Sequence, residues 1–191
     1  LLHWGRRWWR IERIPGKKMR ETMYIRSATE RDIPAILEIY ERARQFMRQN
    51  GNPTQWTGGY PDEGIVRWDM ERGCLYVCVE GEEIVGAFAF IPGEDPTYNV
   101  IKDGSWRSDE PYAAIHRLAS AGKVKGIAKA CFDFCRERCP HLRVDTHRDN
   151  KPMQADLRKY GFKERGIIYI QDGTERIAFD YLAWEDGPAG E

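Results

Sequence analysis

Hydrophobic positions along this chain recur at two spacings, one typical of helices and one typical of strands. Between residues 33 and 47, apolar side chains return every three or four residues, so they share one face of a helix that packs on a sheet. Segments 74–79 and 84–91 are strands, the second of them apolar nearly throughout, and the turn Gly81-Glu82-Glu83 predicts that they form a hairpin. The helical stripe consists of Ile33, Ile36, Leu37, Tyr40, Ala43 and Met47.

Further segments with these spacings follow to the C-terminus, separated by turns that contain glycine or proline. A polar stretch from 94 to 110 interrupts them, and loops of that length inside a domain are commonly functional or disordered. The order of elements predicts an α/β (α+β) fold: a mixed, mostly antiparallel sheet of about seven strands flanked by about four helices. The additional strands are expected over 24–28, 115–118, 142–147, 162–170 and 174–182, and the additional helices over 61–70, 127 to about 138, and 151–160.

The composition narrows the class of protein. With 191 residues the chain is long enough for one domain with a sizeable core, which we place at 23–184. Thirty Lys and Arg balance thirty Asp and Glu, so no global charge attracts nucleic acid or a membrane. No apolar run reaches the roughly 18–20 residues that span a bilayer. The five cysteines lack a zinc spacing, and three of them, four residues apart, fit one buried helix stripe, so we expect free thiols, no metal and a cytoplasmic location.

The two ends of the chain differ from this domain. In residues 1–22, Trp4, Trp8 and Trp9 are interleaved with arginines, a composition that can bind a membrane or single-stranded nucleic acid. We favour the alternative that these residues are a disordered or non-native extension, because Met23 stands directly before the first strand. We expect the tail 185–191 to be disordered as well.

A short turn between the strand at 115–118 and the following helix has the features of an anion site. It carries Gly122 and Gly126 and the basic residues Lys123 and Lys125. Glycines before a helix start leave backbone N–H groups unpaired, and the helix dipole adds positive potential that suits a diphosphate. An ordinary strand-to-helix connection uses glycine as readily, so the turn alone leaves both interpretations open.

Residues around this turn resemble a known family. Lys123-x-x-Gly126-x-Ala128 is similar to the [Q/R]-x-x-G-x-[G/A] loop of the GNAT acetyltransferase superfamily, with Lys in place of the usual Gln or Arg. Asn150 and the later Lys159-Tyr160-Gly161-Phe162 resemble the family's "N…GF" element, and the resemblance extends from residue 24 to 182. It implies acetyl-CoA as cosubstrate, with contacts from Leu118, Ala119, Ser120, Lys123, Val124, Lys125, Gly126, Ile127, Ala128 and Asn150.

Acetyl transfer to an amine also needs a group that takes the amine's proton. His116 is the preferred candidate because its unperturbed pKa lies near neutrality, and Glu110, Asp109, Asp145 and His147 are the alternatives. The family often supplies a tyrosine as general acid four residues before the glycine of "GF". Leu157 stands at that position, and Tyr160 is the nearest phenol.

The acceptor pocket is expected from two loops. Trp56 and Trp106 would form an aromatic wall, and Asp109 or Glu110 would attract an ammonium group. The resemblance implies an acetyl-CoA-dependent N-acetyltransferase that acts on a primary amine of a small molecule or peptide by direct attack in a ternary complex. The alternative is a non-catalytic acyl-CoA-binding or regulatory module on the same fold. A homodimer stays open.

Overall fold

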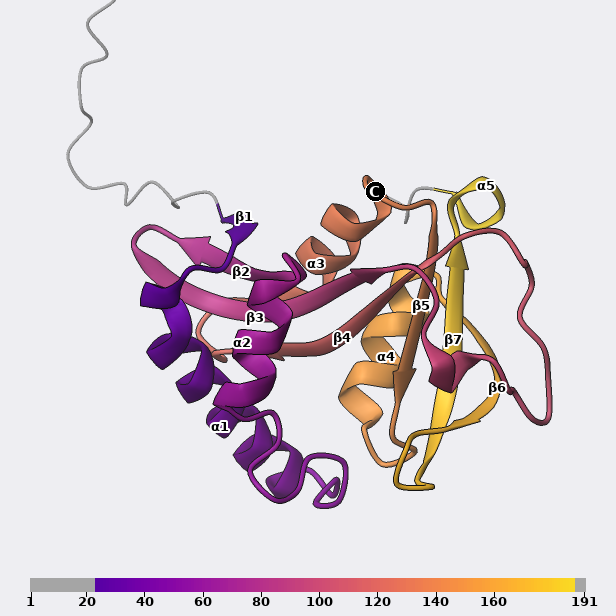
Figure 1. Ribbon diagram of the computed structural model, residues 1–191, viewed down its shortest axis with the longest axis horizontal. Coiled ribbons are helices and arrows are strands. Elements are labelled where there is room, and N and C mark those ends of the chain that lie inside the picture. The colour runs from indigo at the N-terminus through magenta and orange to yellow at the C-terminus, as the bar shows by residue number, and fades with distance from the viewer. Residues whose placement is uncertain (1–22, 188–191) are drawn as a thin grey trace, which may run out of the picture.

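The computed structural model describes residues 23–187 (Figure 1). The predictions for 1–22 and for the last residues of the tail, 188–191, lie outside the described residues. Within the described range the chain forms β1 (Tyr24–Ser27), α1 (Ile33–Gln49), α2 (Glu63–Glu71), β2 (Leu75–Glu80), β3 (Glu83–Pro92), β4 (Ala113–Ser120), α3 (Ile127–Arg136), β5 (His141–Thr146), α4 (Lys151–Tyr160), β6 (Lys163–Tyr169), β7 (Glu175–Leu182) and α5 (Ala183–Asp186), with 3₁₀ turns η1 (Glu30–Asp32) and η2 (Pro96–Tyr98).

One seven-stranded sheet runs through the molecule in the order β1-β2-β3-β4-β5-β7-β6. Its neighbouring strands are antiparallel except β4 and β5, which are parallel. The crossover connection between two parallel strands usually contains a helix, and here that helix is α3. The predicted fold class is confirmed.

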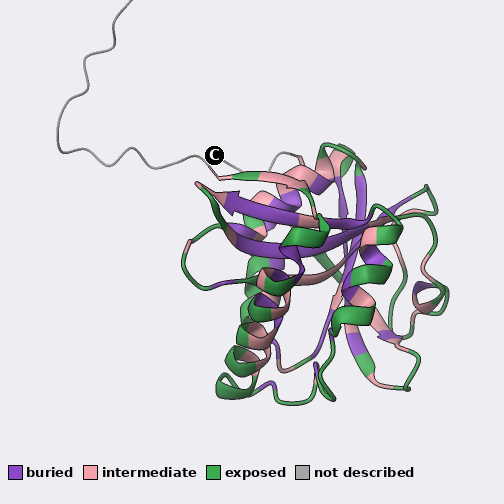
Figure 2. Ribbon diagram, turned by 60° about the vertical axis from the view of Figure 1, so that its left-hand side comes forward, coloured by how far each residue is buried: buried purple, intermediate pink, exposed green. Residues whose placement is uncertain are grey.

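Helices cover both faces of the sheet. α1 and α2 lie over β2, β3 and β4, where the apolar face of α1, including Ile36 and Tyr40, packs on Val77 and Ala87. α3 and α4 cover the opposite face through a core that reaches from β2 to β7. Figure 2 shows that the central strands are buried while the outer faces of the helices are exposed. The sheet therefore separates two helical layers.

The parallel pair at the centre of the sheet is short. β4 and β5 pair only at Ala113 with Leu142 and at Ala114 with Arg143. Beyond Ala114 the strands diverge, and the remainder of β4 has no strand partner on its β5 side among the described residues. The sheet thus opens from Ile115 onward, next to the turn that leads into α3.

The structure also differs from expectation near the C-terminus. Glu185 and Asp186, which we expected in a disordered tail, belong to α5. Arg107 of the long loop donates hydrogen bonds to Asp180 of β7 and to Asp186, at 2.7 Å each. These ion pairs fix the short helix and the loop to the C-terminal end of β7.

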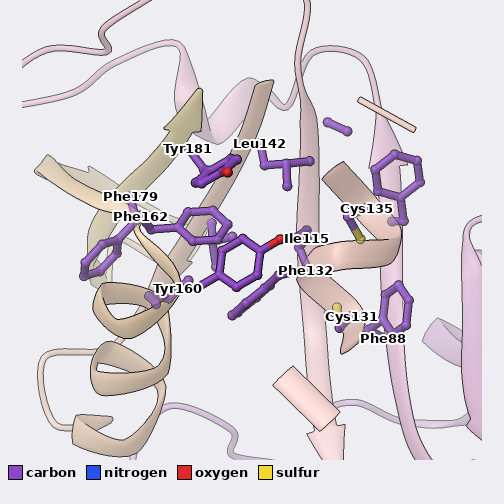
Figure 3. Packing of buried hydrophobic residues seen from close by; sticks show 14 of the residues in the cluster. Phe88, Ile115, Cys131, Phe132, Cys135, Leu142, Tyr160, Phe162, Phe179 and Tyr181 are labelled. Atoms are coloured by element: carbon purple, nitrogen blue, oxygen red, sulfur yellow. The ribbon is translucent and has the colours of Figure 1, made fainter. Parts of the chain in front are cut away.

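The cysteines agree with the prediction of free thiols. Cys131 and Cys135 of α3 are buried in the core beside Phe132 (Figure 3). Burial raises the pKa of the Cys78 thiol, on β2, to about 12. These side chains serve the packing of α3 on the sheet.

Candidate active site

The turn between β4 and α3 presents a row of backbone donors. The N–H groups from Lys123 to Lys129 donate to no protein acceptor within the part of the chain that the structure describes. The first helical bond of α3 runs from the Ala130 N–H to the Gly126 carbonyl. Gly126 caps the helix with a φ of 86°, a left-handed conformation that favours glycine. The geometry has the features of an anion site at a helix start.

Packing determines where this helix start lies. Ile127 is buried, and a Cβ added to Gly86 of β3 would stand 2.7 Å from its Cγ2 atom. The missing side chain at Gly86 therefore lets α3 approach the sheet closely. Lys123 pairs with Glu83 at 3.0 Å, while Lys125 is exposed. Of the two lysines, Lys125 presents its charge to solvent without an ion pair in the described residues.

A β-bulge interrupts β4 just before the turn. Arg117 and Leu118 together face Phe88 of β3, and Arg117 has a φ of 54°. Its guanidinium binds both carboxylate oxygens of Asp69 of α2, at 2.7 and 2.8 Å, and donates to the Tyr60 hydroxyl at 3.1 Å. Burial acts to lower the pKa of Arg117, but Tyr60 and Asp69 outweigh it and raise that pKa. This buried ion pair ties the bulge to α2.

His116 lies between two carboxylates. Its Nε2 atom is 2.9 Å from Asp95 Oδ2, and its Nδ1 atom is 3.8 Å from Asp145 Oδ2 of β5. Burial acts to raise the pKa of Asp95, but hydrogen bonds from His116 and Thr97 outweigh it and hold that pKa well below its ordinary value. Asp95 therefore stays ionised and can accept a proton from Nε2, and the neutral imidazole with its proton on Nε2 has its Nδ1 lone pair directed at the gap toward Asp145.

Asp145 connects this pair to further groups. The Tyr98 hydroxyl donates to Asp145 Oδ2 at 2.9 Å, and burial raises the pKa of Tyr98 well above its ordinary value. Arg176 of β7 lies on the other side, with its Nε atom 4.0 Å from Asp145 Oδ1. His116, Asp145 and Arg176 thus form a row across β4, β5 and β7, on the face of the sheet opposite α3.

Asn150 holds the start of α4 and reaches the α1–α2 loop. Its Oδ1 atom accepts the Met153 N–H, and its Nδ2 donates to Gln55 Oε1 at 3.0 Å. Asn52 donates to the same Gln55 oxygen. The predicted cofactor contact of Asn150 remains a prediction, since both ends of this side chain bind protein atoms.

The tryptophans predicted for the acceptor pocket pack behind the residues that contact Arg117 and Asp145. Trp56 is buried against Tyr40 and Tyr60, with edge-on ring contacts. The ring of Trp106 faces the Arg143 guanidinium at 4.1 Å, and its N–H donates to the Tyr98 carbonyl. The two rings support Tyr60 and Tyr98, which contact Arg117 and Asp145 directly.

Three other predicted residues are not brought to His116. The Tyr160 hydroxyl donates to Asp133 of α3 at 2.8 Å, and its ring is buried among Phe132, Phe162 and Tyr181 (Figure 3). Burial raises the pKa of Tyr160, and its role as general acid remains a prediction. The side chains of Asp109 and Glu110 are exposed, and Glu110 instead accepts a hydrogen bond from His141 at its carbonyl.

The sequence interpretation missed Asp95, Asp69, Arg117 and Arg176. Asp95 carried a readable signal, because Asp followed by Pro96 is typical of a helix start, and it caps η2 through the Thr97 N–H. Arg117 and Asp69 are 48 residues apart, so no local pattern indicates their pairing.

Comparison with known proteins identifies the family. The acetyltransferase (GNAT) family matches residues 33–162, which include the bulge, the turn and α4. The chain belongs to the acetyltransferase (GNAT) family. The predicted family and the prediction of an acyltransferase are confirmed. No curated protein matches the sequence significantly.

Solved structures of this family share the fold. A GNAT acetyltransferase of Streptococcus agalactiae has a TM-score of 0.78 and 29% identity, covering 86% of this GNAT chain and 97% of its own. A ribosomal-protein-alanine N-acetyltransferase of Brucella melitensis has a TM-score of 0.58, 22% identity and coverages of 83% and 99%. For yncA of Salmonella typhimurium, solved with its cofactor acetyl-CoA, the values are 0.55, 17%, 88% and 98%. At these identities the last two show the fold alone.

Two further features of this GNAT chain concern ligands and membranes. Among residues 23–187, no group of three or more His, Cys, Asp or Glu side chains is placed to hold a metal ion. None of the described helices combines the length and the apolar character that crossing a membrane requires.

Proposed function

We propose that this protein transfers the acetyl group of acetyl-CoA to a primary amine by direct attack in a ternary complex. The observation that carries the proposal is the gap between His116 Nδ1 and Asp145 Oδ2, 3.8 Å wide, beside the open edge of β4. A nitrogen atom can lie about 2.9 Å from both atoms at once, which is ordinary hydrogen-bond length. The two atoms are therefore spaced so that one amine nitrogen beside them can hydrogen-bond to both.

The cofactor would occupy the opening between β4 and β5. The diphosphate would accept hydrogen bonds from the N–H groups that begin at Lys123, since these have no protein acceptor in the described range. The pantetheine amides would pair with the unpartnered edge of β4 at Leu118 and Ser120, while the backbone groups of Ala119 between them face β3. This arrangement directs the thioester toward the bulge, next to His116.

The chemical step follows from these positions. An amine arrives as an ammonium ion, which Asp145 attracts, and His116 Nδ1 takes one proton. The freed nitrogen lone pair attacks the thioester carbon, so a C–N bond forms and the C–S bond breaks. Backbone N–H groups at the bulge would stabilise the oxyanion of the intermediate. CoA leaves as a thiolate, the newly acylated nitrogen gives up its second proton to that thiolate or to water, and the proton held by His116 passes to solvent.

The test combines binding and turnover. Calorimetric titration of the purified protein with acetyl-CoA should give binding in roughly the micromolar range, and a panel of primary amines should then release CoA. His116→Gln should lower kcat by about 10²–10⁴-fold with unchanged acetyl-CoA affinity. Binding of acetyl-CoA without turnover on any amine would favour the non-catalytic module, which the displaced family tyrosine also fits. No binding would overturn the proposal.

A further inference from the structure

Arg176 is a buried cation whose guanidinium has few hydrogen-bond acceptors in the protein. Its side chain is 6% exposed, yet in the described part of the chain its only hydrogen bond runs from Nη1 to the carbonyl of its neighbour Glu175. The nearest carboxylate oxygen, Asp145 Oδ1, lies 4.0 Å from Nε, which is beyond hydrogen-bond length. A guanidinium has five N–H donors, so most of its donor capacity is unused.

Burying such a group has a cost that a partner must offset. Desolvation lowers the pKa of Arg176, and the nearby Asp145, Asp172 and Tyr60 oppose that shift only in part. The contrast with Arg117 is direct, because the Arg117 side chain is 12% exposed and is held by both oxygens of Asp69. A buried arginine without such a bidentate carboxylate is suited to receive one from a ligand.

The position of Arg176 relates it to the reacting centre. Asp145 separates two gaps: one of its oxygens lies 3.8 Å from His116 Nδ1, and the other lies 4.0 Å from Arg176 Nε. All three side chains lie on one face of the sheet. An acceptor that places its amine in the first gap therefore lies beside the same Asp145 carboxylate that Arg176 approaches from its other oxygen.

We infer that the acceptor is a small amine with a carboxylate close to its nitrogen, as in a free α-amino acid, and that Arg176 binds this carboxylate. The inference rests on the proposed function, since it assigns the acceptor of that reaction. The charges alternate correctly: Asp145 faces the ammonium and Arg176 faces the carboxylate. A peptide N-terminus, which carries an amide in place of that carboxylate, would leave Arg176 unpaired.

The experiment compares acceptors that differ only in the carboxylate. Alanine and ethylamine, leucine and 3-methylbutylamine, and phenylalanine and phenethylamine form three such pairs. With the wild-type protein, kcat/KM for the amino acid should exceed that for the amine by roughly 100-fold, the range expected for a charge-assisted bidentate pair. This comparison needs no variant, so it is independent of any folding defect.

Variants then assign the preference to Arg176. Arg176→Met should reduce the ratio of the two kcat/KM values by roughly 100-fold, and Arg176→Lys should retain part of it. Arg148→Met is the matched control, because Arg148 is an exposed arginine nearby, and it should leave the ratio unchanged. Calorimetric titration of the CoA-saturated protein with leucine provides a second readout, and binding should be lost in Arg176→Met.

The outcomes separate the two proposals. If amines are acetylated with no preference for a carboxylate, the inference is wrong and the proposed function stands. If leucine binds in an Arg176-dependent manner but no acceptor is acetylated, the carboxylate site stands and the proposed function is wrong. Equal losses on both members of each pair in Arg176→Met would show that Arg176 only stabilises the fold, which overturns the inference.

Discussion

The turn between β4 and α3 and the polar row around His116 are neighbouring regions built in different ways. The turn consists of consecutive residues whose backbone N–H groups point to one place. The polar row consists of side chains from the η2 loop, β4, β5 and β7 that meet only in the folded chain. A region built from the backbone tolerates changes of side chain but not of conformation. A region built from side chains has the opposite sensitivity.

The largest expected effect concerns the ion pair that holds the bulge. Asp69→Asn leaves the buried Arg117 without its bidentate partner and should reduce the free energy of unfolding by about 3–5 kcal/mol, measured by chemical denaturation. Glu63→Gln on the same helix is the control, because it removes an exposed pair with Arg67 and should cost at most about 0.5 kcal/mol. Equal costs would mean that the burial of Arg117 has no energetic role.

The backbone-built region should fail when its conformation or its charge changes. Gly126→Asp places a strained, negatively charged residue at the helix start and should weaken acetyl-CoA binding by at least about 100-fold in calorimetry. Gly173→Asp is matched to it, since Gly173 has a similar φ of 80° and open space around its Cα in the β6–β7 hairpin. The control should bind as the wild type does. Unchanged affinity in Gly126→Asp would reduce the turn to a connector.

The polar row around His116 should respond to the exchange of a single side-chain oxygen for nitrogen. Asp95→Asn keeps the oxygen that accepts from Thr97 but presents an NH₂ group to His116 Nε2, which favours the tautomer with a proton on Nδ1. We expect kcat to fall by roughly 10- to 100-fold with KM little changed. Thr97→Val removes only a hydroxyl from the same turn, and a similar loss of kcat there would contradict the tautomer argument.

The same variant has a predicted dependence of stability on pH. Because the pKa of Asp95 is lowered in the folded protein, its carboxylate stabilises the fold above the ordinary Asp pKa of about 3.9. That contribution is lost as the pH falls through the lower folded value. The difference in free energy of unfolding between wild type and Asp95→Asn should therefore be present at neutral pH and shrink below about pH 4. A difference that grows in acid would contradict the assignment.

The smallest effect sharpens the contrast between the two regions. Lys125 is exposed and lies outside any ion pair in the described residues, so Lys125→Ala should weaken acetyl-CoA binding by less than about 5-fold, and less still at high salt. A loss as large as that of Gly126→Asp would show that lysine charge, and not the backbone, holds the diphosphate.

The same contrast explains what the sequence could predict. The stripe from Ile33 to Met47 and the apolar strands carry periodic signals over many residues, and the sheet and helices agree with them. The turn at Gly126 is contiguous, so its pattern was visible. Arg117 and Asp69, or Asp145 and Arg176, are brought together by strand order and by a bulge, and neither leaves a local trace. Tyr160 shows the limit of a local motif, since its position beside "GF" did not indicate that its hydroxyl binds Asp133 and that its ring packs on Phe132.

β4 and β5 are paired at two positions, so the backbone hydrogen bonding between strands is interrupted at the centre of the sheet. Under the proposed function, the pantetheine arm would form hydrogen bonds there in the way that an added strand does. The amide protons of Leu118 and Ser120, which face away from β3, would then exchange with solvent more slowly in the loaded protein than in the free one. Deuterium uptake along β4 would therefore report the fraction of protein molecules that have bound acetyl-CoA, without any acceptor present. The bound cosubstrate would in this way be a part of the sheet beside which it reacts.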